Sequence, residues 1–222
     1  MKVIITGATG MVGEGVMHEC LLHPDVLEIL LLSRKPSGVV HAKVKELVHD
    51  DLLQLEPRAG EFASYDACFY CLGISSVGKN EADYTRVTYD LTLHVARILS
   101  EQNPEMVFCY VTGEGTDSSE SGRSMWARVK GRTENALLKL PFKGTYMYRP
   151  GYIHPTKGLA HTHGYYKLLG ALYPILRRLM PRHVTTLKEL GLSMIHIAQN
   201  GYDKTIVDSL SIAKLAKPDK AI

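Results

Sequence analysis

The feature that most constrains the fold of this chain is a glycine-rich turn that joins a β-branched run to a helical pattern. Lys2–Thr6 is a short apolar run typical of a buried strand, and apolar residues recur at helical spacing over Met11–His23. The turn and the start of the helix read Thr6-Gly7-Ala8-Thr9-Gly10-Met11-Val12-Gly13. We expect Gly7 to permit the tight turn, Gly10 to let main-chain N–H groups approach a pyrophosphate, and Gly13 to let helix and strand pack closely. The turn therefore predicts a dinucleotide-phosphate site.

Further apolar runs continue the pattern of short strands. They are Val26–Leu32, Val44–Val48, Tyr65–Cys71, Met106–Thr112 and Thr145–Tyr148. These runs show little alternation of apolar and polar residues, which indicates strands buried on both faces. Helical patterns at about 83–101 and 123–140 lie between them and imply right-handed crossovers. We predict an α/β fold with a doubly wound parallel sheet.

The pattern changes after Arg149-Pro150. An apolar helical stripe runs from Tyr165 to Leu179; such a stripe could rest on a membrane or a partner, although packing over a sheet is its usual role. Thr185–Gln199 and Asp208–Lys217 predict two further helices. We therefore divide the chain into a nucleotide-binding domain over residues 1–150 and a small helical lid over residues 151–222 that completes the same single-domain fold.

Composition argues against several classes of function. Lysine plus arginine exceed aspartate plus glutamate by only 26 to 23, and the charges are spread along the chain instead of forming the basic stripe that nucleic-acid binding needs. The apolar run at the N-terminus meets Gly7 well short of a secretory signal, and no uncharged apolar stretch approaches bilayer length. We expect a small-molecule substrate, no nucleic-acid partner, no stable membrane insertion, and a monomer or homodimer.

Cysteine and histidine usage bears on compartment and metal binding. Four cysteines lie in apolar segments: Cys20, Cys68, Cys71 and Cys109. A chain of this size does not need disulfides, so we expect free thiols, a reducing compartment and a cytoplasmic protein. Cys68 and Cys71 spell C-x-x-C, but residues three apart on a strand point to opposite faces and cannot share a metal. His161 and His163 lack a third ligand nearby in the sequence, so we expect no metal.

The residues after the second apolar run indicate which dinucleotide the site prefers. A carboxylate there accepts hydrogen bonds from a ribose 2′-OH, whereas a cation accommodates a 2′-phosphate. The chain has Ser33, Arg34 and Lys35 at this place and no acid. Arg34 can pair with the phosphate and stack on adenine while Ser33 and Lys35 assist, so we predict NADP(H) in preference to NAD(H). The alternative is that the two cations are simply solvated.

Two further segments are expected on the adenosine side of the site. Asp50 or Asp51, after the third apolar run, is placed to accept a hydrogen bond from the adenine amino group. Cys71, Leu72 and Gly73, after the fourth run, are expected to pass under adenosine. Both expectations rest on position in the chain.

Three separated motifs follow the glycine-rich turn. They are Tyr110-Val111-Thr112-Gly113, Trp126-Ala127-Arg128-Val129-Lys130-Gly131 and Arg149-Pro150-Gly151-Tyr152-Ile153. With the turn, they resemble the short-chain dehydrogenase/reductase superfamily, in particular its atypical and extended branches with epimerase- and dehydratase-like members, over Met1 to about Pro155. The resemblance implies a Rossmann-like NAD(P)-binding fold. It also implies that further residues contact the cofactor: Thr9, Met11, Val12, Lys130, Pro150 and Gly151.

The same resemblance implies a set of catalytic positions. In that superfamily a tyrosine and a lysine, four residues apart on one helix face, carry out proton transfer, and a serine or threonine after the fifth strand holds the substrate oxygen. The lysine also holds the nicotinamide ribose and lowers the phenol pKa. Lys130 and Thr112 match these roles, but the tyrosine position is Trp126. Indole is neither an acid nor a base near neutral pH, so the usual proton relay is absent from the sequence.

Other residues could fill the missing role. Tyr152 and His154 follow the sixth strand at the family's substrate edge, and Tyr165 or Tyr166 could reach in from the lid. Hydroxyl groups are poor acids and usually serve as caps. The loop before the helix offers several: Thr116, Ser118, Ser119 and Ser121. Trp126 itself fits a packing residue over the cleft better than a catalytic one.

The sequence supports three functional hypotheses. The first is an NADP(H)-dependent oxidoreductase that reduces a small carbonyl compound held between Thr112, Tyr152 and the lid. The second is a non-catalytic NADP(H)-binding sensor whose partner contacts depend on the bound nucleotide. The third, a sugar-nucleotide epimerase or dehydratase, usually requires the tyrosine that Trp126 replaces. Of these, the oxidoreductase is our expectation.

Overall fold

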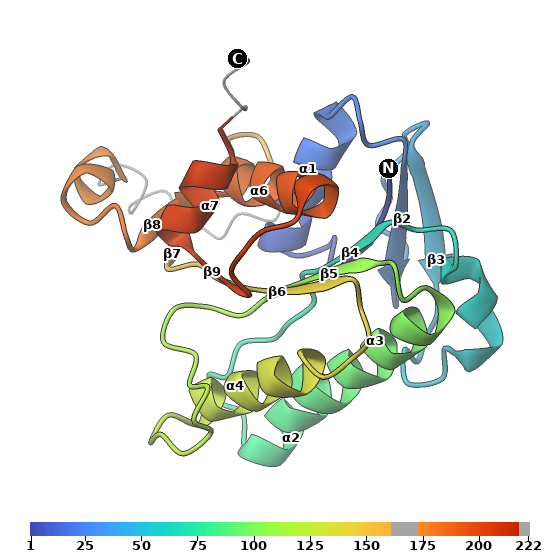
Figure 1. Ribbon diagram of the computed structural model, residues 1–222, viewed down its shortest axis with the longest axis horizontal. Helices are drawn as coiled ribbons and strands as arrows, with labels where there is room; N and C mark the ends of the chain where they lie inside the picture. Colours follow the sequence, from blue (N-terminus) through green and yellow to red (C-terminus); the bar gives the residue numbers. More distant parts are fainter. Residues whose placement is uncertain (161–172, 218–222) are drawn as a thin grey trace.

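The computed structural model describes residues 1–160 and 173–217. At its centre lies a parallel sheet of seven strands in the order β3-β2-β1-β4-β5-β6-β9 (Figure 1). Its strands are β1 (Lys2–Thr6), β2 (Glu28–Ser33), β3 (Val44–Val48), β4 (Ala67–Tyr70), β5 (Val107–Val111), β6 (Gly144–Arg149) and β9 (Ile206–Asp208). The strand order reverses between β1 and β4, which is the switch point of a doubly wound sheet. The predicted fold class is therefore confirmed.

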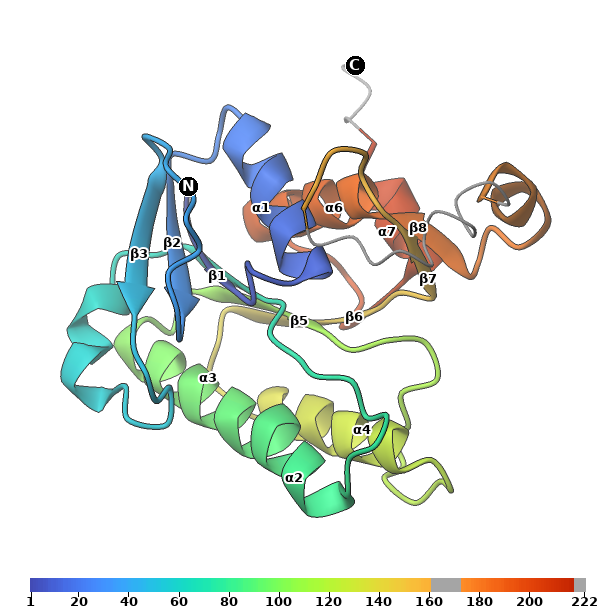
Figure 2. The same ribbon diagram turned by 180° about the vertical axis from the view of Figure 1, so that it is seen from behind.

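Helices cover both faces of the sheet (Figures 1 and 2). One layer holds α1 (Met11–Leu22), α6 (Leu187–Asn200) and α7 (Ser209–Leu215). The other holds α2 (Glu81–Thr85), a π-helical segment η2 (Arg86–Asp90), α3 (Leu91–Gln102) and α4 (Met125–Leu137), with the 3-10 helix η1 (Glu56–Phe62) beside α3. Because all the strands of the sheet are parallel, their carboxyl ends meet at one edge, where the connecting loops converge.

Glycine lets α1 and α6 approach each other closely. A Cβ atom at Gly15 of α1 would lie 2.8 Å from the Leu187 side chain, and one at Gly191 of α6 would lie 2.8 Å from the Glu19 side chain. Larger residues at either position would force the helices apart. The part of the chain from residue 151 onward contributes α6 and α7 to this helix layer and the edge strand β9 to the main sheet. It also forms a second parallel sheet of β7 (Tyr152–His154) and β8 (Val184–Thr186).

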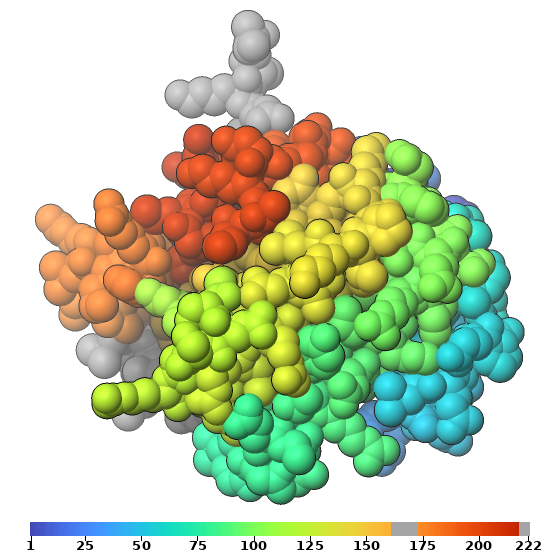
Figure 3. Space-filling model, turned by 60° about the horizontal axis from the view of Figure 1, so that its bottom comes forward, coloured from blue at the N-terminus to red at the C-terminus, as the bar shows by residue number. Residues whose placement is uncertain are grey.

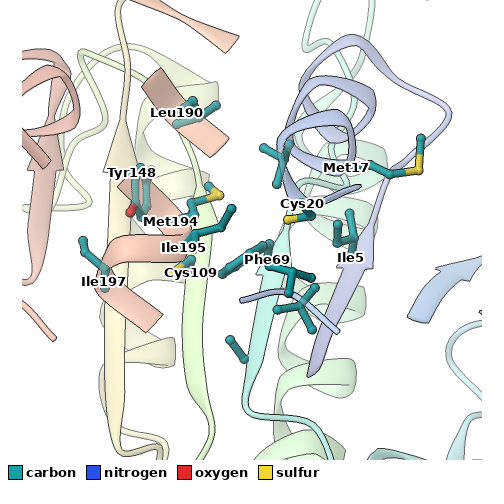
Figure 4. Close-up of a cluster of buried hydrophobic side chains, with 14 of the residues drawn as sticks. Ile5, Met17, Cys20, Phe69, Cys109, Tyr148, Leu190, Met194, Ile195 and Ile197 are labelled. Atoms are coloured by element: carbon teal, nitrogen blue, oxygen red, sulfur yellow. The ribbon is translucent and has the colours of Figure 1, made fainter. Parts of the chain in front are cut away.

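Two clusters of buried apolar side chains hold the layers together, one on each face of the sheet. The cluster beneath α1 and α6 includes Ile5 and Phe69 from the sheet and Met194 from α6 (Figure 4). Cys68 belongs to the cluster on the opposite face, whereas Cys71 packs against the first cluster. The prediction that these two cysteines face opposite sides is confirmed. Burial raises the pKa of the Cys71 thiol to about 12, which disfavours the reactive thiolate.

Several boundaries differ from the sequence expectations. The helix expected over Thr185–Gln199 begins only at Leu187, because Val184–Thr186 forms β8 and Thr186 caps the helix in a capping box with Glu189. Likewise, the helix expected from Asp208 follows β9, whose last residue, Asp208, caps it. Strand β3 was expected to be buried on both faces, but only Leu47 of its five residues is buried, because β3 lies at the sheet edge.

The apolar stripe expected over Tyr165–Leu179 falls largely outside the described residues. Within the described part, residues 173–179 are helical, and Ile175 and Leu179 are exposed. Tyr165 and Tyr166 lie outside it, as do His161 and His163. Over residues 1–160 and 173–217, none of the helices combines the length and the apolar character needed to cross a bilayer.

We predict that Gly13→Ala lowers the free energy of unfolding by about 1–3 kcal/mol, because overpacking a close contact strains its surroundings. A Cβ atom at Gly13 would lie 2.2 Å from the main-chain oxygen of Gly7. Gly60→Ala is the control, since a Cβ atom there meets nothing within 4 Å. Urea unfolding of the three proteins measures the effect, and equal stability of both variants would contradict the close-packing role of Gly13.

Candidate functional site

The glycine-rich turn forms an open cradle at the carboxyl end of β1. Gly7 has a φ of +70°, a conformation that favours glycine, and a Cβ atom there would lie 2.8 Å from the Cys71 carbonyl oxygen. Gly10 begins α1 without a side-chain cap, so amino-terminal N–H groups of this helix face no capping side chain. A Cβ atom at Gly10 would meet only the Gly7 oxygen, at 3.5 Å. The turn therefore has open space next to main-chain N–H donors, which is the arrangement that a pyrophosphate needs.

The residues expected to bind the 2′-phosphate lie at the carboxyl end of β2, the strand beside β1. Ser33 is buried, and its hydroxyl donates to the Lys35 carbonyl oxygen at 2.7 Å, which shapes the turn. Arg34 and Lys35 are exposed. Over residues 1–160 and 173–217, Arg34 makes no ion pair, so its guanidinium is available to an anion at the end of this strand.

The segments expected on the adenosine side occupy different environments. Leu72 donates its main-chain N–H to the Thr6 hydroxyl at 3.1 Å, so the Cys71–Gly73 segment is tied directly to the glycine-rich turn. Asp51 is exposed, and its two carboxylate oxygens accept from the Leu53 N–H and the Gln54 amide. The Leu53 hydrogen bond is the main cause that lowers the Asp51 pKa. Asp51 therefore shapes a turn through both oxygens.

A cleft of about 770 Å³ opens at the carboxyl edge of the sheet, between β4, β5 and β6. All the residues expected to be catalytic line it, namely Thr112, Trp126, Lys130 and Tyr152. Besides Lys130, five other residues expected to hold the cofactor line it as well, namely Val12, Cys71, Gly73, Pro150 and Gly151. Ser33, Arg34, Lys35 and Asp51 are not part of its lining. The expected site thus divides into a catalytic cleft and an adenosine end beyond the glycine-rich turn.

Lys130 is held in this cleft by the strand opposite its helix. Its Nζ donates to the Thr112 main-chain oxygen at 2.5 Å. Burial lowers the Lys130 pKa to about 8, although the Glu134 carboxylate opposes the shift. The ammonium group is therefore fixed in position and close to losing its charge in mildly alkaline solution.

A buried charge network supports the cleft from behind. The Glu134 carboxylate is almost fully buried and accepts hydrogen bonds from the Arg149 guanidinium, including Nε at 3.1 Å, and from the Thr112 hydroxyl at 2.6 Å. Arg149 also donates to the Ser118 hydroxyl at 2.5 Å. The network ties α4, β5 and β6 together. Our sequence reasoning missed Glu134, although it lies four residues after Lys130 and hence on the same side of α4.

Trp126 lines the cleft and packs against the loop after β5. A Cβ atom at Gly115, where φ is +86°, would lie 3.5 Å from the Trp126 ring. The loop hydroxyls considered as proton donors are engaged within the loop: the Thr116 hydroxyl donates to the Gly113 oxygen at 2.7 Å and that of Ser119 to Asp117 at 2.6 Å. These contacts order the loop that carries one wall of the cleft.

Two side-chain contacts near the cleft were not predicted from the sequence, although Tyr152 and His154 were each named as candidates for proton transfer. Glu114, which lines the cleft, is hydrogen bonded to His183 Nδ1, so the loop after β5 is joined to the segment before β8. In Figure 3 the yellow-green loop between β5 and α4 lies beside the orange residues that precede β8. Tyr152 and His154 form the second pair, with the Tyr152 hydroxyl 3.4 Å from His154 Nδ1. The partners of the first pair are 69 residues apart in the sequence, which explains why only the fold brings them together.

We predict that Glu134→Ala lowers the free energy of unfolding by about 3 kcal/mol or more, because it leaves the largely buried Arg149 charge without its partner. Glu105→Ala is the matched control. Glu105 pairs with Lys143 at 3.9 Å on the surface, where an ion pair contributes about 1 kcal/mol or less. Urea unfolding measures both variants. Similar losses for the two would mean that the buried network does not hold the cleft walls together.

Residues 3–122 match the model of the NAD dependent epimerase/dehydratase family. Among solved structures, the fold is similar to the PhqB reductase domain from Penicillium fellutanum, with a TM-score of 0.66 and 15% identity over 90% of this chain and 64% of that one. It is also similar to the Bordetella bronchiseptica enzyme WbmG in complex with NAD and UDP, with a TM-score of 0.66 and 10% identity over 96% of this chain and 76% of that one.

Curated relatives are similar in sequence as well. "Protein fmp52-1, mitochondrial" from Aspergillus terreus is 24% identical over 165 residues, which cover 70% of this chain and 68% of the relative. "Protein FMP52, mitochondrial" from Candida albicans is 25% identical over 68% of this chain and 66% of the relative. "Protein HTATIP2" from Rattus norvegicus is 26% identical over 68% of this chain and 62% of its own length. The chain thus spans about two thirds of these relatives.

The names of the fungal relatives overturn the expectation of a cytoplasmic protein, because they are called mitochondrial. The expectation rested on cysteines in apolar segments and on the lack of a secretory or membrane-spanning stretch. Buried free cysteines indicate only that the protein folds in a reducing environment. They do not distinguish the cytoplasm from other reducing compartments, so the inference was wrong.

Proposed function

Because the chain belongs to the NAD dependent epimerase/dehydratase family, we propose that it is an oxidoreductase that uses NADP(H), in preference to NAD(H), to reduce a small carbonyl compound. The observation that carries this proposal is the cleft next to the switch point, where Thr112, Trp126, Lys130 and Tyr152 lie together beside the glycine-rich turn. Cofactors bind at this place in doubly wound sheets. When bound, the reduced nicotinamide supplies a hydride to the carbonyl carbon.

The residues of the turn hold the pyrophosphate in this proposal. Gly7, Thr9, Gly10, Met11, Val12 and Gly13 surround the amino end of α1, where main-chain N–H groups and the helix dipole favour an anion. Cys71, Leu72 and Gly73 lie against the adenosine, since Leu72 is hydrogen bonded to Thr6 next to the turn. Asp51 stands at the far end of the adenine, where its occupied oxygens limit it to a weak contact.

The preference for NADP(H) is supported by the charge at the end of β2. Arg34 is exposed and extends from the strand whose carboxyl end meets the adenosine ribose. A guanidinium binds a phosphate through two parallel charge-assisted hydrogen bonds. Lys35 adds a second positive charge, and Ser33 fixes the turn through its bond to the Lys35 oxygen.

On the nicotinamide side, Lys130 holds the ribose, and Pro150 and Gly151 form the opposite wall. The Thr112 hydroxyl donates its hydrogen to Glu134, so it offers only acceptor positions to the cleft. It therefore suits a substrate that carries a hydroxyl group beside the carbonyl. Tyr152 completes the substrate side of the cleft.

A second candidate function is a non-catalytic NADP(H)-binding sensor, and Trp126 is the residue that favours it. Indole cannot supply the proton that the family's tyrosine supplies. The two functions differ in one measurable property, because a sensor binds NADPH without consuming it in the presence of carbonyl compounds.

The test of cofactor preference uses Trp126 as a reporter, since it is the one tryptophan of the sequence and lines the cleft. NADPH should quench its emission. We predict that Arg34→Ala weakens NADPH binding by about ten- to hundredfold, the cost of about 1.5–3 kcal/mol for a lost charged hydrogen bond. The affinity for NADH should change far less.

Arg97→Ala is the control for this test, because Arg97 is an exposed arginine on α3, outside the cleft lining. It should leave both affinities unchanged. Equal losses of NADPH and NADH affinity in Arg34→Ala would contradict the preference for NADP(H), and an emission that responds to neither nucleotide would contradict cofactor binding itself.

The lowered pKa of Lys130 predicts a pH dependence of binding. A lysine is charged below its pKa and neutral above it, so NADPH affinity should fall, on the order of tenfold, as the pH rises through about 8 and the charged hydrogen bond is lost. Lys130→Arg keeps its charge over this range and should flatten the profile. Titrations of Trp126 emission between neutral pH and about one unit above the pKa measure it. Parallel profiles for the two proteins would exclude Lys130 from the binding site.

A further inference from the structure

Reduction of a carbonyl consumes a proton, and Trp126 cannot supply it. Within the described residues, four cleft-lining side chains carry groups that exchange protons: Cys71, Glu114, Lys130 and Tyr152. Burial holds the Cys71 thiol protonated and inert, and the Lys130 ammonium donates to the Thr112 oxygen. Glu114 pairs with His183 at the exposed rim. The geometry of Tyr152 is different, because its hydroxyl faces a histidine.

Tyr152 and His154 lie two residues apart on β7, so their side chains lie on the same side of the strand. The pairing of β7 with β8 fixes both main-chain positions, since Tyr152 lies opposite Val184 and His154 opposite Thr186. The Tyr152 hydroxyl is 3.4 Å from His154 Nδ1, and both side chains are half-buried. A phenol in the cleft is thus connected to an imidazole, the side chain best suited to exchanging protons near neutral pH.

The imidazole is itself held in place. The Tyr173 ring stacks on the His154 ring with centroids 3.9 Å apart and planes inclined by 18°. Burial, with a smaller contribution from the positive charge of Lys157, lowers the His154 pKa, so the ring is predominantly neutral near neutral pH. A neutral imidazole has one N–H and one acceptor nitrogen, so it can take a proton at one nitrogen and release one from the other.

On the basis of the function proposed above, we propose that Tyr152 is the proton donor to the substrate oxygen and that His154 relays protons to it, with Tyr173 positioning the imidazole. The electron pair arrives with the hydride of the reduced nicotinamide. The Tyr152 O–H bond breaks as the O–H bond of the product alcohol forms. As His154 donates its Nδ1 proton to the phenolate, its Nε2 accepts a proton from solvent, so the ring stays neutral. Proton exchange with solvent then restores the Nδ1–H tautomer for the next turnover. A tyrosine–histidine pair on β7 thereby takes over the proton transfer for which α4 has the lysine but not the tyrosine.

The first arm of the test detects the contact between the Tyr152 hydroxyl and His154 Nδ1 in the absence of substrate. In protein labelled with nitrogen-15 at histidine, the His154 signals are identified by their loss in His154→Asn. Tyr152→Phe removes the hydroxyl and should shift the His154 Nδ1 signal. Tyr202→Phe, which removes a hydroxyl bonded to Ser211 away from the cleft lining, should leave it unchanged. An unshifted His154 signal in Tyr152→Phe would overturn the pair.

The second arm measures turnover of NADPH with hydroxyacetone and 2-hydroxyacetophenone, which carry a hydroxyl group beside the carbonyl, and with benzaldehyde, which lacks it. Tyr152→Phe should lower kcat by about 10²–10⁴-fold, the usual contribution of an acid catalyst, with the KM for NADPH unchanged. His154→Ala should lower kcat and recover part of it when imidazole is added. Tyr173→Ala should lower kcat, whereas Tyr173→Phe, which keeps the stacking ring, should not.

The outcomes separate this inference from the proposed function. A wild-type protein that binds NADPH and reduces a probe, with kcat unchanged in Tyr152→Phe, overturns the relay and leaves the oxidoreductase intact. If the wild-type protein binds NADPH but reduces none of the probes, both the proposed carbonyl reduction and the Tyr152–His154 relay are overturned. Loss of kcat in His154→Ala without recovery by imidazole assigns His154 a structural role and contradicts the relay.

Discussion

The close approach of three main-chain segments at the carboxyl end of β1 is the constraint on which the site depends. Gly7, Gly13 and Cys71 come so near one another that a Cβ atom at either glycine would meet main-chain atoms at less than 3 Å. This approach sets the start of α1 directly after the turn that follows β1, and no side chain caps the N–H groups of its first turn. The position of the proposed phosphate site therefore follows from the close packing of the main chain and does not depend on any side chain.

The second constraint is electrostatic and lies on the other side of the switch point. Glu134 and Arg149 place opposite charges between α4 and β6, and the Thr112 hydroxyl closes the network at the end of β5. A buried ion pair adds little to stability compared with an apolar core, but it accepts only a narrow range of geometries. The pair thus fixes the angle at which Lys130 and Trp126, on the same helix, face the cleft.

Sequence reasoning predicted the sheet because each buried strand has a long apolar run, as in Val107–Val111 and Glu28–Ser33. It missed β7, β8 and β9, which have three residues each. Because β8 and β9 run directly into helices, Thr185 and Thr186 of β8 and Asp208 of β9 were read as the start of those helices. The sequence motifs predicted most of the residues that line the cleft. The contacts of Glu114 with His183 and of His154 with Tyr173 join residues far apart or of unremarkable type, and only the folded chain reveals them.

The pairing of β6 with β9 has a consequence for how the chain is assembled. Met147 to Arg149 of β6 pair with Ile206 to Asp208 of β9. In the chain, β7, β8 and α6 lie between these two strands. On the ribosome, six strands can associate while this flank of the sheet still exposes unsatisfied backbone groups, which is the kind of edge that recruits other chains. Nascent protein is therefore most vulnerable to aggregation until the residues beyond 205 have been synthesised, and a chaperone that shields β6 would act in that interval.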